Sequence, residues 1–374
     1  MDRADGLVLL RNSERSTWRR CRMKWEWSYN RALSPPRDKP ALTFGTMMHG
    51  ALEVRYPPGR KRGPHPADTF KKLYRDHGDD FMQWDDDGDR VDALELGVAM
   101  CNTYVDTYGE DEGIEIIQPE QHVQVDVCDR QGNYICTWVG TMDALYYDLL
   151  QSTRSKRVIG ALEHKTAKRI DENLSIISGY GEQGLSYIWA AEHHAHHEGI
   201  LDEGEHIDHV RFNWLKKMLP DTRPMNAAGQ RLNKPAKDAL WQAVEDRHLV
   251  LPKSATIVQL TAALKKVGVD AALLGEVSKR QPGPLVWRQK LDVSQNMLAE
   301  INRRIRAEAW EIAQFRAGKL PLTKNPTKDC DWDCPFKDAC ELHEMGADYE
   351  SMFQLEFTTW NPYEDHELDL ERTN

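Results

Sequence analysis

No run of apolar residues in this 374-residue sequence approaches the roughly 20 that a membrane-spanning helix needs. The first ten residues, MDRADGLVLL, also lack the pattern of a secretory signal peptide. Cysteine is scarce, and seven residues in a chain of this length indicate thiols kept reduced, not a disulfide scaffold. These absences predict a cytoplasmic protein that has no membrane partner.

An excess of positive charge is missing as well, since the net charge is −11. Proteins that bind nucleic acid contact phosphates through Lys and Arg, so this balance at first argues against such a partner. Most of the deficit lies in residues 341–374, which hold ten acidic residues and one Arg. The rest of the chain is close to neutral and can still present a basic groove. The net charge therefore does not exclude DNA as a partner.

The spacing of apolar residues changes from helical to alternating along the chain. Helical spacing covers the segments 41–56, 67–77, 91–108, 172–198 and 292–317. Alternating spacing predicts strands at 121–127, 134–140, 142–150, 157–166 and 207–215. We therefore predict an α/β fold, with a helical insertion at 221–290 and an exposed acidic tail at 346–374.

Two of the predicted strands carry residues suited to metal-dependent hydrolysis. Asp143 starts one strand, and the next strand holds Glu163 and Lys165. Because strand side chains alternate, Glu163 and Lys165 point to the same face. Carboxylates can hold Mg²⁺, and an ammonium beside them can act on a water or a phosphate. By itself this pattern is also typical of a solvent-exposed ion pair.

Four short motifs occur in an order that resembles the RecB-like branch of the PD-(D/E)XK nucleases. They are GTMMH, which ends at His49, GTMDAL around Asp143, ALEHKT around Glu163, and EQGLSY, which holds Gln183 and Tyr187. The resemblance covers the chain from about Ser16 to Leu342 and is weakest at 221–290. It implies a restriction-endonuclease-like core over residues 1–345, with a central mixed β-sheet flanked by helices.

The resemblance also implies a role for each matching residue. Asp143 and Glu163 would bind Mg²⁺ or Mn²⁺, helped by the main-chain carbonyl of His164 and by His49. Lys165 would act on the attacking water or stabilise the charge that develops on the phosphate. Gln183 and Tyr187 would position the lysine and the DNA strand from one helix face. Glu120, which precedes the first strand of the hairpin, is a further candidate acid.

Four cysteines form a second candidate site. Cys330, Cys334 and Cys340 lie close together near the C-terminus, and Cys21 lies near the N-terminus. Four thiolates suit either a [4Fe–4S] cluster or zinc. The arrangement resembles the iron–sulfur nucleases of the same branch, which include the AddB subunit and the CRISPR-associated four-cysteine exonucleases. The three residues between Cys330 and Cys334, where two are usual, leave zinc as the alternative metal.

Two other groups of polar residues favour simpler interpretations. The acids of residues 85–89 lack the order of a calcium-binding loop, so we expect an exposed acidic loop. The histidines His193, His194, His196 and His197 could bind a transition metal, but an exposed helix end is the better interpretation.

The motifs together predict an exonuclease that acts on DNA ends or single strands in replication, recombination or repair. The Arg and Trp residues of 18–27 would suit a surface that binds a DNA strand. The alternatives are a structure-specific endonuclease and a non-catalytic DNA-binding module that keeps the fold. Family analogy adds a helicase, a recombinase or an annealing protein as partner. The size and the NPT-x-x-C segment are similar to phage-encoded proteins, which implies a viral origin.

Overall fold

The structure, a computed structural model, describes residues 8–35, 40–77, 82–84, 90–170 and 182–364. The chain divides into two compact units. The larger unit is formed by Met1–Lys217 and Val286–Asn374, and the smaller one by Met218–Leu285. Within the described residues, no helix is both long and apolar enough to cross a membrane.

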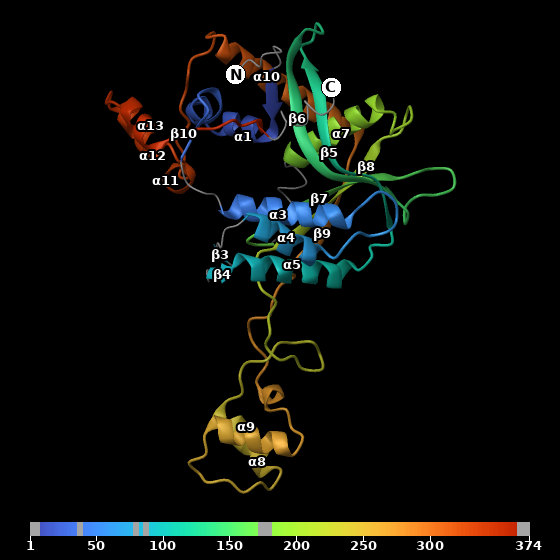
Figure 1. The fold of residues 1–374 in the computed structure, drawn as a ribbon, viewed down its shortest axis with the longest axis vertical. Helices are drawn as coiled ribbons and strands as arrows, with labels where there is room; N and C mark the ends of the chain where they lie inside the picture. Colours follow the sequence, from blue (N-terminus) through green and yellow to red (C-terminus); the bar gives the residue numbers. More distant parts are fainter. Residues whose placement is uncertain (1–7, 36–39, 78–81, 85–89, 171–181, 365–374) are drawn as a thin grey trace. The chain divides into compact units, whose positions relative to one another are not determined.

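A six-stranded mixed sheet forms the centre of the larger unit (Figure 1). Its strands are β1 (Leu9–Arg11), β5 (Ile114–Cys128), β6 (Tyr134–Asp148), β7 (Ile159–Ala167), β8 (Ile207–Lys216) and β9 (Val286–Asp292). Neighbours run antiparallel except β1 with β6 and β7 with β8, which are parallel. The strands β5, β7 and β8 overlap the predicted strands, but β6 is one continuous strand where two were predicted, at 134–140 and 142–150. Asp143 therefore lies inside a strand and not at its start, and Glu120 lies within β5 and not before it.

The strand β6 has one continuous edge and one interrupted edge. Along one edge it pairs with β5 over nearly its whole length. Along the other edge, Thr137–Val139 pair with β1 and Ala144–Tyr147 pair with β7. Within the part of the chain that the structure describes, residues 140–143 therefore have no strand partner on that edge, and the sheet opens there. Asp143 borders this opening.

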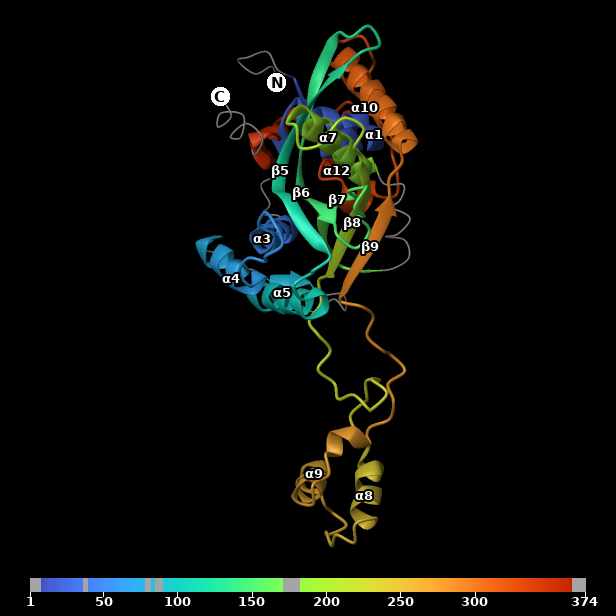
Figure 2. The same cartoon turned by 90° about the vertical axis from the view of Figure 1, so that its right-hand side faces the viewer.

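Helices cover both faces of the sheet (Figure 2), which confirms the predicted α/β fold with a central mixed sheet flanked by helices. One face is covered by α1 (Asn12–Arg20), α7 (Glu182–His197) and α10 (Gln295–Arg316). The other is covered by α3 (Pro40–Arg55) and α5 (Ala93–Tyr108), and α4 (Pro66–His77) packs against both of these helices. The predicted helix 172–198 is described only from Glu182, and residues 171–181 lie outside the described residues.

The helix α10 shows how sequence spacing produces this packing. Its buried residues, Leu298, Ile301, Ile305, Ala309 and Ile312, recur every three or four positions and form one stripe. Ser294 caps the helix by accepting a hydrogen bond from the main-chain N–H of Met297. The stripe joins the main hydrophobic core together with residues of α7 and the β5–β6 hairpin.

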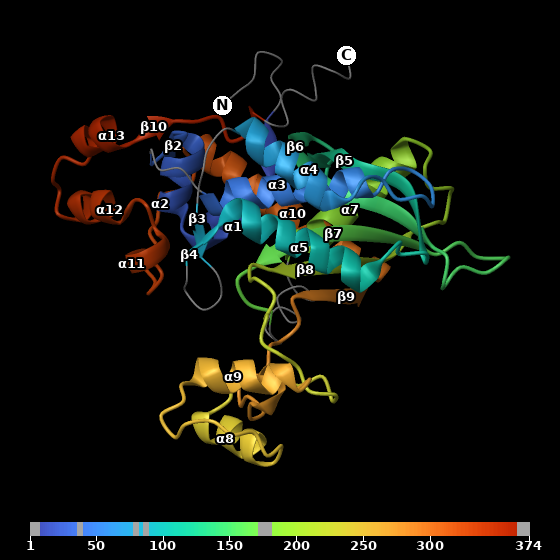
Figure 3. The ribbon, with the colours of Figure 1, turned by 60° about the horizontal axis from the view of Figure 1, so that its bottom comes forward.

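The two ends of the chain form a small subassembly beside the sheet (Figure 3). Near the N-terminus, α2 (Arg22–Trp25), a π-helical turn (Glu26–Asn30) and β2 (Leu33–Ser34) follow α1. They meet the C-terminal elements α11 (Cys330–Asp333), α12 (Lys337–Glu344), α13 (Glu350–Glu356) and β10 (Thr358–Thr359), and β10 pairs with β2. Trp27, Phe336 and Phe353 are buried together in this contact.

This contact corrects the prediction of an exposed tail at 346–374. Phe353 is only 3% exposed, and Glu350 forms an ion pair with Arg31 at 2.6 Å. The prediction rested on the acidic composition of this segment. A few apolar residues at helical spacing are nevertheless enough to pack α13 against the N-terminal elements. Residues 365–374 lie outside the described residues, as do residues 85–89 of the predicted acidic loop. That loop separates β3 (Met82–Trp84) from β4 (Arg90–Asp92), which pair as a hairpin.

The smaller unit contains α8 (Lys237–Glu245), α9 (Ile257–Lys266) and a 3₁₀ turn (Ala271–Leu274). Its core consists of residues such as Leu240, Val244, Leu260 and Leu264, all fully buried. The predicted insertion, 221–290, overlaps this unit, but residues 286–290 belong to β9 of the main sheet. A polar, alternating strand at a sheet edge carries a weak sequence signal, which explains the misplaced boundary.

A buried histidine on β8 lies within hydrogen-bond distance of a tyrosine on β6, across the intervening strand β7. His209 on β8 is fully buried, and its Nε2 lies 2.7 Å from the Tyr146 hydroxyl on β6. Gly160 on the intervening strand permits this approach, because a Cβ there would lie 2.5 Å from that hydroxyl and 2.7 Å from the His209 Nε2. Burial, reinforced by the nearby charges of Lys290 and Arg211, lowers the pKa of His209 to about 4.

We expect His209 to make folding stability depend on pH. The unfolded chain takes up a proton near pH 6.5, whereas the folded chain does so only near pH 4, so stability falls as pH drops through this window. Between pH 7.5 and 5.0 the loss from this residue should be about 2 kcal/mol. Chemical denaturation at both pH values should show a smaller pH effect, by that amount, for His209→Gln. Equal pH effects in the two proteins would contradict the expectation.

Candidate active site

Asp143 lies where the sheet opens, and it is held from two sides. Its Oδ1 lies 2.9 Å from Nδ1 of His49 on α3. Its Oδ2 accepts a hydrogen bond from the main-chain N–H of His164 on β7. Burial raises the pKa of Asp143, but His49, His164 and Lys165 outweigh it and leave the pKa well below its usual range. The residue is thus a carboxylate fixed in position at the opening.

Glu163 and Lys165 project from β7 toward the face that α7 covers. Glu163 is 5% exposed and lines a small void together with Gly184 and Tyr187 of α7. The Lys165 Nζ lies 2.5 Å from the Glu163 Oε1. Burial raises the pKa of Glu163 and the Asp143 charge adds to this, while the Lys165 ammonium opposes it. Two carboxylates and one ammonium therefore share a water-poor site.

His164 points to the opposite face of the sheet, as strand alternation requires. Its ring stacks on Tyr56 at 5.7 Å, and its Nδ1 lies 3.3 Å from Asn213 Nδ2. Burial lowers the pKa of this imidazole to about 4. The side chain is thus part of the packing behind β7. Only the main chain of His164 remains available for the metal role implied by the resemblance.

The helix α7 brings Gln183 and Tyr187 over the same site. The Gln183 Nε2 donates to the Tyr187 hydroxyl at 3.5 Å, as their spacing of four residues allows. Tyr187 lies close enough to Lys165 for the ammonium charge to act on the phenol, although burial raises the pKa of Tyr187. Gly140, at the gap in β6, makes room for the phenol, since a Cβ there would meet the Tyr187 ring at 2.7 Å.

The sequence analysis missed one acid at this site. Glu53 is one helical turn beyond His49 on α3, so both side chains lie on the same helix face. Burial raises the pKa of Glu53 to about 7, and the neighbouring carboxylates of Glu120 and Asp143 add to this effect. Glu120, the further candidate acid, thus lies next to Glu53. The spacing of four from His49 is the signal that could have revealed Glu53.

The arrangement concentrates acidic groups around the opening in the sheet. Asp143, Glu163, Glu53 and Glu120 come from three strands and one helix, while Lys165 supplies one compensating positive charge. Several carboxylates at close range repel one another, and a bound divalent cation relieves that repulsion. The oxygen-rich donor set fits Mg²⁺ or Mn²⁺.

The four predicted cluster cysteines come together at the junction of the chain ends. Cys21, Cys330, Cys334 and Cys340 are free thiols that line a single pocket of about 410 Å³. Burial raises the pKa of Cys334, although the main chain of Phe336 and the charge of Lys24 oppose this effect. Across the described residues, no three cysteine sulfurs lie within 4.8 Å of one another.

The Trp residues of 18–27 do not provide the base-stacking surface that the sequence predicted. Trp18, Trp25 and Trp27 are at most 2% exposed, so their rings cannot stack on bases. Arg15 is fully buried, and its guanidinium contacts Glu308 of α10 at 2.7 Å and Glu182 of α7 at 3.1 Å. Aromatic and basic residues at close spacing here serve packing between helices.

The comparisons with known proteins give no family for this chain. No protein-family model matches the sequence, and no curated protein matches it either. The case for a function therefore rests on the arrangement of Asp143, Glu163, Lys165 and the residues around them.

We expect Arg15 to hold α7 in place through its buried ion pairs. Replacing it by Met would leave the carboxylates of Glu182 and Glu308 without their buried partner, at a cost of about 3 kcal/mol. The matched control is Arg19→Met, because Arg19 contacts the same two acids from a side chain that is 34% exposed. That change should cost about 1 kcal/mol or less. Urea denaturation of the variants measures both, and equal losses would refute the assigned role.

Proposed function

We propose that this chain is a metal-dependent DNA nuclease of the PD-(D/E)XK type, with motifs similar to the RecB-like branch. One observation carries the proposal. Asp143, Glu163 and Lys165, which lie up to 22 positions apart in the sequence, meet His49 from a separate helix at the opening in the sheet. A surface ion pair, the simpler interpretation of the ExK pattern, would not bury Glu163 to 5% exposure.

The divalent metal would be Mg²⁺ or Mn²⁺, held by Asp143 and Glu163 with the main chain of His164. When bound, it would hold the phosphate and lower the pKa of a water. His49 keeps Asp143 oriented through the 2.9 Å contact. Lys165 places an ammonium beside Glu163, where it can stabilise negative charge that develops on the phosphate.

Gln183 and Tyr187 act from the helix that covers this face. Their hydrogen bond orients the phenol above Gly140 and toward Lys165. The phenol limits where the lysine can point and excludes water from one side of the ammonium. Glu53 and Glu120 extend the acidic surface away from Glu163, on the side where α3 meets β5.

Loss of the Lys165 ammonium should abolish cleavage without unfolding the protein. We expect Lys165→Ala to reduce the cleavage rate by about 100-fold or more, because it removes charge stabilisation from the transition state. Lys156→Ala is the matched control, since Lys156 lies in the loop before β7 and pairs only with Asp208 at the surface. The measurement is degradation of end-labelled single- and double-stranded DNA with Mg²⁺ and with Mn²⁺, using protein purified without oxygen.

The same assay distinguishes the classes of function. We propose an exonuclease, so linear DNA should be degraded while a closed circular plasmid survives. Cleavage of the circle would indicate the endonuclease alternative. Lack of cleavage on every substrate by intact wild-type protein would contradict the nuclease proposal and favour a DNA-binding module. Equal activity of wild type and Lys165→Ala would refute the assigned site.

We also propose that the four cysteines hold a [4Fe–4S] cluster. Four thiolates from one pocket suit such a cluster, and zinc is the alternative. Lys24 and Lys324 line the same pocket and bring positive charge to it. The cluster would join both ends of the chain beside α1.

The cluster predicts a brown protein whose colour depends on the clustered cysteines. Protein purified without oxygen should absorb near 400 nm and contain iron and sulfide in equal amounts. Cys330→Ser should lose most of this absorption, whereas Cys128→Ser should keep it, because Cys128 lies on β5 outside the pocket. A colourless wild-type protein that contains zinc would overturn the iron–sulfur assignment and leave the nuclease proposal standing.

A further inference from the structure

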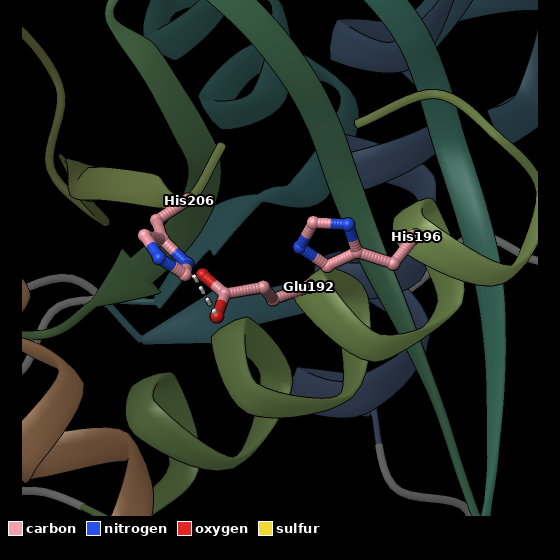
Figure 4. A group of neighbouring side chains, drawn as sticks. All are labelled: Glu192, His196 and His206. Atoms are coloured by element: carbon pink, nitrogen blue, oxygen red, sulfur yellow. Dashed lines mark hydrogen bonds and ion pairs between the residues drawn. The ribbon is translucent and has the colours of Figure 1, made fainter. Parts of the chain in front are cut away.

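Three polar side chains converge at the far end of α7, away from the proposed catalytic residues (Figure 4). Glu192 and His196 are one helical turn apart on α7, and His206 precedes β8. Each offers a ligand atom, and these atoms all lie within 4.8 Å of one another. Along the helix, His196 is about 13 Å from Tyr187, so this group is separate from the candidate active site.

Glu192 is a buried carboxylate that other groups hold in a fixed orientation. It is 7% exposed, and its Oε2 accepts a hydrogen bond from the main-chain N–H of Ile207 at 2.9 Å. Its Oε1 accepts from the Gln295 side chain on α10 at 3.3 Å. Each carboxylate oxygen has a further lone pair, so these bonds leave Glu192 able to bind a metal ion.

The buried charge of Glu192 has no lysine or arginine partner among the described residues. Its ion-pair partner is His206, whose Nδ1 lies 3.3 Å from Oε1. Burying a carboxylate is costly unless a positive charge compensates for it. Another nearby acid, Glu205, is paired with Arg157 at 2.6 Å, and His196 lies near enough to lower its pKa as well. A cation bound between Glu192 and the two imidazoles would supply the missing charge.

We propose that Glu192, His196 and His206 form a binding site for a divalent transition-metal ion of the zinc type. Two imidazoles and one carboxylate suit Zn²⁺, Co²⁺ or Ni²⁺, whereas Mg²⁺ and Ca²⁺ prefer oxygen ligands alone. A zinc ion with bonds near 2.0 Å brings its ligands to about 3.3 Å apart, so ligand atoms that now lie within 4.8 Å of one another need to close by at most about 1.5 Å. Rotation of the His196 and His206 side chains provides that movement, since Glu192 is fixed and His206 is 46% exposed.

The site would join the end of α7 to the start of β8. The helix carries Gln183 and Tyr187, and β8 pairs in parallel with β7, which carries Glu163 and Lys165. An ion bound to both elements holds the helix against the sheet at a point distant from the substrate. Its role is structural, and it does not depend on the proposed nuclease activity.

The neighbouring residue His197 provides a matched control. It lies on the same helix, is 84% exposed, and bonds to Glu198 at 3.0 Å, outside the three converging residues. His206→Gln and His196→Gln each remove one proposed ligand, whereas His197→Gln removes an exposed histidine and keeps the site. If one proposed variant fails to fold, the other still tests the proposal.

The experiment is a Co²⁺ titration of the full-length protein, followed by visible absorption and by the shift in thermal unfolding temperature. The proposal predicts absorption bands of Co²⁺ bound to nitrogen and oxygen, without the intense thiolate charge transfer that the cysteines would produce. Wild type and His197→Gln should bind one more Co²⁺ than the two ligand variants and should gain more in unfolding temperature. Competition with a zinc chelator should show affinity reduced about tenfold or more in the ligand variants.

Two outcomes would overturn the proposal. Equal binding by wild type and His206→Gln would mean that the three residues do not hold an ion. An equal loss of binding in His197→Gln and His206→Gln would mean that Co²⁺ binds exposed histidines in general. Cleavage of DNA is not part of the readout, so a failed nuclease proposal leaves this test intact.

Discussion

The interrupted edge of β6 is the constraint on which the candidate active site depends. A strand paired on both edges has its main-chain groups committed to its neighbours. Between β1 and β7, residues 140–143 of β6 lack such a partner on one edge, and Asp143 lies at the boundary. The main-chain N–H of His164 is thereby free to bond the Asp143 carboxylate. Without this opening, Asp143 would sit within a continuous ladder.

A polar and aromatic network supports β7 from the face opposite Glu163 and Lys165. The His164 ring packs between Tyr56 and Tyr104, and Asn213 of β8 bonds to both His164 and Tyr104. Arg288 of β9 donates a hydrogen bond to Asn213 and forms an ion pair with Asp111. Burial strengthens both interactions, because the surroundings have a low dielectric constant. Burial opposes the charge of Asp111, but Arg288 outweighs it and holds the pKa of that carboxyl below its usual range. Rigid packing on this face fixes the strand that presents Glu163 and Lys165 on the other.

The helices that cover the Glu163 face of the sheet, α1, α7 and α10, are held together by ion pairs as well as by apolar packing. Arg15 of α1 reaches both α7 and α10, and Cys21 directly follows α1. Contacts through α1 thus connect the proposed cluster with Arg15 and with α7, the helix that carries Tyr187. The C-terminal elements complete it, since Tyr363 and Arg316 both bond the fully buried Glu14 of α1. Segments more than 300 positions apart in the sequence are therefore needed to hold the same face of the sheet.

The sequence alone was sufficient for the fold class and for grouping the candidate residues. Alternation placed Glu163 and Lys165 on one face of a strand, and helical spacing placed Gln183 beside Tyr187, because both periods are local properties of the backbone. Glu53 lies on the same helix face as His49, but only the packing of α3 against the sheet brings it to Asp143 and Glu120. Burial of Trp18, Trp25 and Trp27, and anchoring of the acidic tail by Phe353, were likewise decided by distant contacts. The group of Glu192, His196 and His206 joins a helix to the segment before the next strand, and such proximity is set by tertiary structure, not by spacing along the chain.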